Sequence, residues 1–113
     1  MASNGVILSF LVIIVLSCID LSSSGWITLY QHRNYGGVML VSRPVSNNDY
    51  KCFNLLDWMK DRGSSINTHG RCFVLFEHEN CQGRSMKVTP DVNCRLNFED
   101  CNFNDITSSF KIC

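Results

Sequence analysis

The chain has 113 residues, with ten Lys and Arg residues balanced by ten Asp and Glu residues. This balance excludes a nucleic acid or an anionic membrane surface as a partner bound through bulk positive charge. The length allows one domain with a modest core and leaves no room for a second.

The first segment of the chain is strongly apolar. Val6 to Ile19 is almost uninterrupted by polar residues and is too short to span a bilayer comfortably. Ser22 to Ser24 then place small residues where a signal peptidase that cuts after Ser24 requires them. We therefore expect residues 1–24 to be a signal peptide and residues 25–113 to be secreted to the extracellular space, with no membrane association after cleavage. An uncleaved membrane anchor and a bacterial lipoprotein signal are the alternatives.

Six of the seven cysteines lie in residues 25–113. An even number in a small exported domain predicts disulfides, because the secretory pathway oxidises thiols and a small core gains from cross-links. The candidates are Cys52, Cys72, Cys81, Cys94, Cys101 and Cys113. Sequence alone does not choose among their possible pairings. A zinc site is the alternative, although no two of these cysteines have Cys-x-x-Cys spacing.

The same part of the chain contains short runs of β-branched and aromatic residues, which predict strands because they are too short for helices. In chain order, strands are expected at 26–30, 38–41, 65–68, 72–76, 85–88 and 109–112. The segments 52–59 and 94–103 are each expected to hold a short strand and a helical turn. Gly37 and Gly83 end the polar stretch inside each predicted hairpin, where a positive φ is needed.

An internal repeat organises these strands. Leu29–Gly37 aligns with Leu75–Gly83, and Asp61–Ile66 aligns with Asp105–Phe110 in the same order. Two ordered matches predict a tandem duplication of a unit of about 40 to 45 residues. Four strands per unit give about eight strands, which predicts an all-β, two-sheet β-sandwich of two Greek key motifs, about 25–69 and about 71–113. Its expected core is Ile27, Leu29, Met39, Val41, Ile66, Val74, Phe76, Met86, Val88, Phe110 and Ile112, whereas the two tryptophans are expected mostly to pack in the core or against loops.

The first hairpin carries a recognisable signature. Tyr30, Tyr35 and Gly37 follow the pattern aromatic-x4-aromatic-x-Gly, which resembles the signature of the βγ-crystallin Greek key. The resemblance covers essentially all of residues 25–113. It implies that Ser65 and Ser109 correspond to the serine that ties each hairpin to the last strand of its unit.

The second hairpin departs from this signature. Phe76 and Gly83 match it, but Cys81 takes the second aromatic position. The aromatic packing over this hairpin is therefore expected to be replaced, with a disulfide as the substitute.

The family resemblance also implies calcium binding. The family motif Asn/Asp-Asn/Asp-x-x-Ser/Thr-Ser is satisfied at every position by residues 104–109, whereas Lys60 replaces the first residue in the equivalent segment 60–65. The chemistry suits Ca²⁺, which takes six to eight oxygen ligands at about 2.3–2.6 Å. The resemblance implies one or two sites. One combines the Ile106 carbonyl with Ser108 and Gln31, the other combines the Arg62 carbonyl with Ser64 and Glu77, and Asn104, Asp61 and Asp105 are the remaining candidates.

The two sites are expected to differ. Lys60 and Arg62 bring positive charge close to a cation at the 60–65 loop, which weakens binding there. The 104–109 loop is therefore the stronger candidate, with an affinity of about 10⁻⁴ to 10⁻³ M or somewhat tighter, as in extracellular modules. Because Asn, Asp, Ser and Thr are also common in turns, a purely structural role for both loops is the alternative.

The sequence does not favour catalysis. Oxidised cysteines offer no thiolate nucleophile, the acids show no spacing that separates a general acid from a base, and His32 and His78 are expected to be exposed hairpin residues. We therefore expect a secreted, non-enzymatic calcium-binding structural or binding module, with a further extracellular protein or matrix partner possible. A secreted toxin or antimicrobial effector and a calcium-independent structural protein remain the alternatives.

Overall fold

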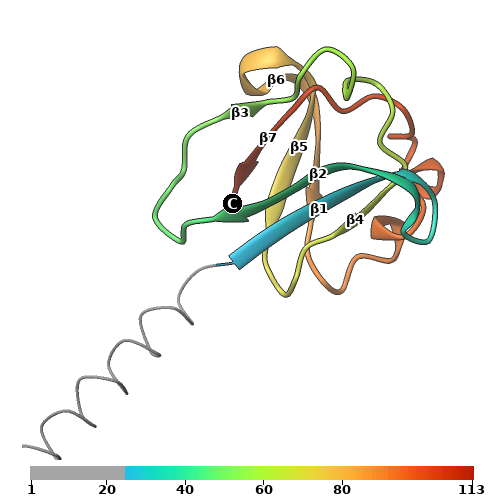
Figure 1. The fold of residues 1–113 in the computed structure, drawn as a ribbon, viewed down its shortest axis with the longest axis horizontal. Coiled ribbons are helices and arrows are strands. Elements are labelled where there is room, and N and C mark those ends of the chain that lie inside the picture. Colours follow the sequence, from blue (N-terminus) through green and yellow to red (C-terminus); the bar gives the residue numbers. More distant parts are fainter. Residues whose placement is uncertain (1–24) are drawn as a thin grey trace, which may run out of the picture.

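The computed structural model describes residues 25–113, and the predicted signal peptide lies outside the described residues. Two antiparallel sheets, one of three strands and one of four, pack face to face (Figure 1). Residues 25–113 contain no α-helix, and hence no helix that is long and apolar enough to cross a membrane. The prediction of an all-β, two-sheet sandwich is confirmed.

The first sheet is built from the first half of the domain. Its strand order is β2 (Gly36–Val45), β1 (Gly25–His32), β4 (Ser65–Asn67). On the central strand, Leu29 lies opposite Val41 on one side and Ile66 on the other, and all three are buried. The buried apolar side chains of β1 therefore face the second sheet.

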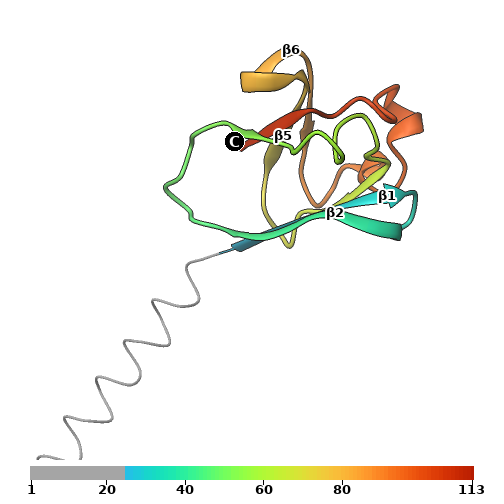
Figure 2. The same ribbon diagram turned by 45° about the horizontal axis from the view of Figure 1, so that its top comes forward.

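The second sheet contains strands from both halves. Its order is β3 (Phe53–Asn54), β7 (Ser109–Ile112), β5 (Phe73–His78), β6 (Gln82–Val88). Strand β3 leaves the first half and pairs with β7, where the Phe53 and Phe110 rings stack 5.3 Å apart. Figure 2 shows the chain between β2 and β3 crossing from one sheet to the other. Because the chain crosses in this way, both halves of the domain contribute side chains to one shared hydrophobic core.

Residues 25–113 form seven strands where about eight were predicted. The missing strand belongs to 94–103, where the chain forms two 3₁₀ helices, η2 (Asn93–Arg95) and η3 (Phe98–Cys101). A disulfide joins Cys94 to Cys101 and brings their Cα atoms within 5.8 Å. Seven extended residues would span about 23 Å, so this closed loop must fold back on itself.

Most of the predicted core is confirmed, with two corrections. Met39 is 56% exposed, because a bulge in β2 opposite Leu29 and Tyr30 turns both Leu40 and Val41 inward. In β5 the inward residues are Phe73 and Leu75, both 0% exposed, whereas Val74 and Phe76 are only partly buried. The predicted core residues that are buried are Ile27, Leu29, Val41, Ile66, Val88 and Phe110, with Met86 and Ile112 packed at the margin.

All six candidate cysteines form disulfides, in the pairs Cys52–Cys81, Cys72–Cys113 and Cys94–Cys101. The first pair connects the segment before β3 to the second hairpin, and the second connects the start of β5 to the end of the chain. The expectation that a disulfide takes the place of the aromatic residue at Cys81 is confirmed.

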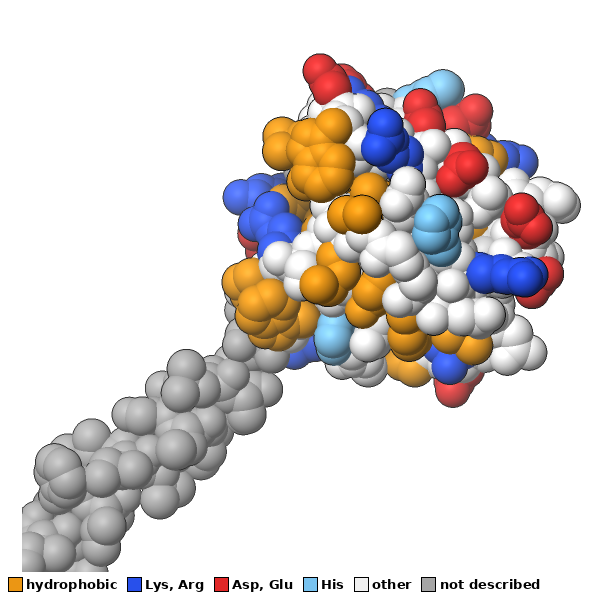
Figure 3. Space-filling view, turned by 45° about the vertical axis from the view of Figure 1, so that its right-hand side comes forward, with side chains coloured by type: hydrophobic (Ala, Val, Ile, Leu, Met, Phe, Trp, Pro, Cys, Tyr) orange, Lys and Arg blue, Asp and Glu red, His pale blue; other side chains and the backbone are white. Residues whose placement is uncertain are grey.

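The surface mixes charge and apolar side chains. Figure 3 shows Lys and Arg interspersed with Asp and Glu on one face, with hydrophobic side chains between them. Trp26 and Trp58 are 48% and 50% exposed, which corrects the expectation that the tryptophans pack in the core or against loops.

Candidate functional site

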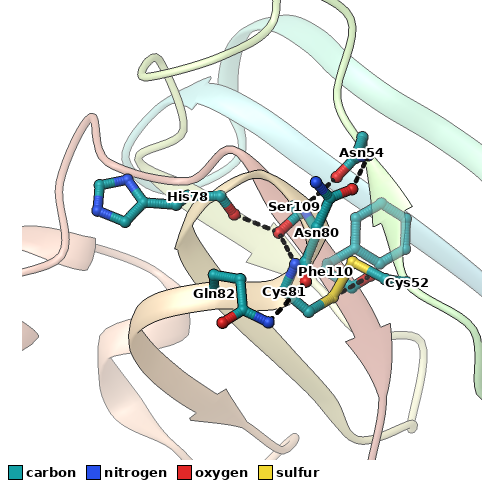
Figure 4. The surroundings of a disulfide bond; sticks show 8 residues. All are labelled: Cys52, Asn54, His78, Asn80, Cys81, Gln82, Ser109 and Phe110. Carbon is teal, nitrogen blue, oxygen red and sulfur yellow. Dashed lines mark hydrogen bonds between the residues drawn. A yellow bond between two sulfur atoms is a disulfide. The ribbon is translucent and has the colours of Figure 1, made fainter.

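Each hairpin is tied to the last strand of its half by a buried serine. The Ser65 hydroxyl donates to the His32 carbonyl (2.6 Å) and accepts from the Tyr35 N–H (3.0 Å). The Ser109 hydroxyl does the same with the His78 carbonyl (2.6 Å) and the Cys81 N–H (3.0 Å; Figure 4). Both serines are 0% exposed, so these bonds fix the hairpin tips relative to the loops that precede the last strands.

The two hairpin tips are stabilised by different side chains. In the first, the Tyr30 and Tyr35 rings stack with centroids 5.2 Å apart. In the second, the Cys52–Cys81 disulfide is accompanied by two hydrogen bonds between Asn54 and Asn80, of 3.0 and 2.7 Å (Figure 4). The second tip is therefore attached to β3 of the opposite half.

The two hairpins have a similar shape, and a histidine packs over the glycine in each of them. Gly37 and Gly83 have φ of 73° and 80°, and an added Cβ would lie 2.5 Å from the ring of His32 or His78. Each exposed histidine thus covers its own glycine. Within residues 25–113, no three His, Cys, Asp or Glu side chains form a group that could hold a metal ion by themselves.

The two predicted cation loops lie side by side and exchange hydrogen bonds. The Asp61 N–H donates to the Thr107 carbonyl (3.1 Å), and the Asp105 N–H donates to the Gly63 carbonyl (2.9 Å). Asp61 and Asp105 both adopt a left-handed conformation, with φ of 58° and 54°. Aspartate tolerates this conformation better than most residues, which accounts for an aspartate at the same place in each loop.

A polar hollow opens where these loops meet the end of β1. It is lined by Gln31, His32, Arg33, Asp61, Arg62, Ser64, Asn97, Glu99, Asn104 and Asp105. We call this the central hollow. Its charged lining consists of two guanidinium groups and three carboxylates, which gives a net negative charge of one with histidine neutral.

Ser64 is the most informative residue of the central hollow. Its backbone is fully used, because its N–H donates to the Tyr30 carbonyl (2.9 Å) and its carbonyl accepts from the Phe98 N–H (2.8 Å). The residue is only 8% exposed, and its hydroxyl has no hydrogen-bond partner within residues 25–113. The Ser64 hydroxyl is not among the fully buried unpaired atoms of residues 25–113, which are Asn47 Oδ1 and Thr107 Oγ1, so it is accessible from the central hollow and free to bind a polar ligand there.

The equivalent place in the other half is arranged differently. The Ser108 hydroxyl donates to Asp61 Oδ1 (3.4 Å). Lys60, which occupies the position equivalent to Asn104, donates to Asp57 Oδ1 (2.9 Å) and forms a close ion pair with Glu79. The Lys60 ammonium group therefore lies between the carboxylates of Asp57 and Glu79, and Lys60 does not line the central hollow.

Six of the nine predicted metal ligands line the central hollow, and three do not. Those present are Gln31, Asp61, Arg62, Ser64, Asn104 and Asp105; those absent from its lining are Glu77, Ile106 and Ser108. Ile106 packs against the core, and Ser108 donates its N–H to the Phe76 carbonyl (2.9 Å), next to Glu77.

The partners expected from the family resemblance are exchanged in the structure. That expectation joined Gln31 to Ser108, and Glu77 to Ser64. In the structure, Gln31 lines the central hollow with Arg62 and Ser64. The reason is strand pairing: the chain entering β4 hydrogen-bonds to β1 of its own half, so each serine lies beside the first strand of the same half.

Sequence reasoning missed the contribution of η3. Asn97 and Glu99 line the central hollow although they belong to neither loop. The only signal for them in the sequence is the short interval between Cys94 and Cys101, which indicates a closed loop once the pairing is known.

Comparison with known proteins identifies the fold. No protein-family model and no curated protein matches the sequence. The structure is similar to a βγ-crystallin from an archaeon (22% identity, TM-score 0.59, covering 79% of this chain and 98% of that one). It is also similar to a βγ-crystallin from Ciona intestinalis (24% identity, TM-score 0.59, covering 79% and 100%). A βγ-crystallin domain from Flavobacterium johnsoniae gives 28% identity and a TM-score of 0.55, covering 77% and 92%. The chain therefore has the βγ-crystallin fold, as the hairpin signature indicated.

Proposed function

We propose that this chain is a secreted, non-enzymatic structural module that binds calcium in the central hollow. Domains of this fold are generally structural or binding modules, and the fold includes calcium-binding members. The observation that carries the proposal is Ser64, a nearly buried residue that lines the central hollow and whose hydroxyl has no partner within residues 25–113 and is accessible to a ligand.

The donor set supports a hard cation. Asp105, Gln31 and Asn104 line the same hollow as Ser64, and their carboxylate and amide oxygens are of the types that Ca²⁺ accepts. Since no group of three acidic or metal-ligating side chains converges within 25–113, neutral oxygens and water would make up most of the shell. Such a site has few charged ligands and is expected to bind in the range of about 10⁻⁴ to 10⁻³ M.

The site around Ser64 is proposed to dominate, which reverses the expectation from the sequence that the 104–109 loop is the stronger candidate. Arg33 and Arg62 also line this site, but its three carboxylates outnumber their two positive charges. At the place equivalent to Asn104, the other half holds the ammonium group of Lys60 in its ion pairs with Asp57 and Glu79. A second cation there would be repelled by Lys60 and would compete with it for carboxylates. We therefore expect a stoichiometry of about one calcium ion per chain at millimolar concentration.

Secretion is part of the same proposal. Calcium is abundant outside cells, where sites of this affinity are used, and the three disulfides fit an oxidising compartment. Since the central hollow takes side chains from both halves of the domain, a bound ion would hold the two loops together and stabilise the folded state.

Calorimetric titration tests the proposal, and the chain offers a matched pair of variants. The full chain is expressed through a secretory pathway, purified with its disulfides intact and titrated with calcium. Ser64→Ala should weaken binding at least about tenfold, because it removes one ligand of a site with few. Ser108→Ala, at the equivalent position outside the lining of the central hollow, should change the affinity less than about threefold. Absence of heat and of thermal stabilisation at about 10 mM calcium would refute calcium binding and favour a calcium-independent structural role.

A further inference from the structure

We propose that Glu99 supplies an additional carboxylate to the cation in the central hollow. This inference rests on the proposed function, because it assigns a ligand to the same site. Glu99 lies on η3, outside both cation loops, and is one of the residues that line the central hollow.

The short helix η3 is hydrogen-bonded to Ser64, the residue whose hydroxyl has no partner within residues 25–113. The Phe98 N–H donates to the Ser64 carbonyl (2.8 Å), and the Phe98 side chain is 0% exposed. The Asn97 side chain accepts from the Glu99 N–H (3.2 Å) and caps the short helix. The Cys94–Cys101 disulfide closes the segment that contains all of these contacts. The backbone of Glu99 is therefore fixed relative to Ser64.

The carboxylate of Glu99 is not committed elsewhere. Within residues 25–113 it forms no salt bridge, although two arginines also line the central hollow. Without Glu99, the two guanidinium groups would balance the carboxylates of Asp61 and Asp105, and the lining would be neutral. Glu99 thus provides the net negative charge that favours a divalent cation.

The neighbouring acid offers a matched control. Asp100 lies on the same short helix and is exposed, as Glu99 is, but it does not line the central hollow. Glu99→Gln and Asp100→Asn remove the same charge one residue apart. A general effect of net charge would therefore appear in both variants, whereas coordination would appear only in Glu99→Gln.

Two measurements on the full, oxidised chain test the inference. Calorimetric titration should show calcium affinity falling about five- to tenfold in Glu99→Gln and less than about twofold in Asp100→Asn. Terbium, an oxygen-seeking cation, would then be bound in place of calcium and its luminescence lifetime compared in H₂O and D₂O to count coordinated waters. Glu99→Gln should gain one or two bound waters, and Asp100→Asn should gain none.

The outcomes separate this inference from the proposed function. If the unmodified chain binds calcium and Ser64→Ala weakens binding at least about tenfold, but Glu99→Gln behaves like Asp100→Asn, Glu99 is not a ligand and the proposed function stands. Weaker binding in Glu99→Gln with no gain of water also overturns ligation. If the unmodified chain binds neither ion, the proposed function and this inference both fail.

Discussion

The Cys52–Cys81 disulfide is expected to be a major source of stability, and replacing both residues by alanine tests this. The bond joins the segment before β3 to the tip of the second hairpin and closes a loop with a sequence separation of 29. The same hairpin tip is also held by the Asn54–Asn80 hydrogen bonds and by the bonds of the Ser109 hydroxyl (Figure 4). These bonds do not involve sulfur, so they are expected to remain in the variant.

The magnitude follows from loop-closure entropy in the unfolded chain. Opening a loop of this length is expected to lower the free energy of unfolding by about 3.5 kcal/mol. Cys94–Cys101, with a separation of only seven residues, provides a matched comparison, since its removal is expected to cost about 2.5 kcal/mol by the same argument. Cys81 has a φ of 55°, and alanine bears the same conformational strain there as cysteine, so the substitution adds no new backbone penalty.

Urea denaturation monitored by tryptophan fluorescence would measure both losses. The Cys52→Ala/Cys81→Ala variant should show the larger decrease in unfolding free energy, by about 1 kcal/mol, and a larger m-value because its unfolded state is more expanded. A smaller decrease for this pair than for Cys94→Ala/Cys101→Ala would refute the argument from loop length.

Three further predictions concern the fold and the processing of the chain. Ser109→Ala leaves the His78 carbonyl and the Cys81 N–H, which are both partly buried, without their partner and should lower the unfolding free energy by about 1–3 kcal/mol in urea denaturation; a loss below about 0.5 kcal/mol would contradict its anchoring role. Leu75→Ala should cost about 2–5 kcal/mol, and Val74→Ala clearly less, because only Leu75 is fully buried; equal losses would show that the observed register of β5 is wrong. Mass spectrometry of the secreted protein should find Gly25 at the N-terminus, and a chain that retains residues 1–24 would overturn the signal-peptide prediction.

The sequence predicted the fold well where the pattern is local. The repeat placed Ser65 and Ser109 at equivalent positions, and the structure gives them the same pair of hydrogen bonds. The error in β5 was avoidable, because the alignment that matches Leu29 with Leu75 also matches buried Ile27 with Phe73. The exposure of Met39 was not predictable in this way, since the bulge that turns it outward depends on the pairing of β2 with β1.

The candidate site was only partly predictable, because it depends on contacts between distant segments. The two loops were identified from their oxygen-bearing residues, and the structure brings them together through the bonds of Asp61 and Asp105. Which strand each loop would lie against depends on strand pairing, and the contribution of Glu99 depends on a disulfide whose partners the sequence does not specify. Lys60 was expected to repel the cation, yet its ammonium group is held by Asp57 and Glu79 and does not line the central hollow.

The most direct test of the central claim is to map calcium binding residue by residue by NMR. Amide chemical shifts of the ¹⁵N-labelled, oxidised protein would be followed during titration with calcium. We predict that the largest changes occur at residues 62–64 and 104–105 and at Gln31, around the central hollow. Shifts concentrated at Glu77 and Ser108, or no saturable shifts by about 10 mM calcium, would contradict the account.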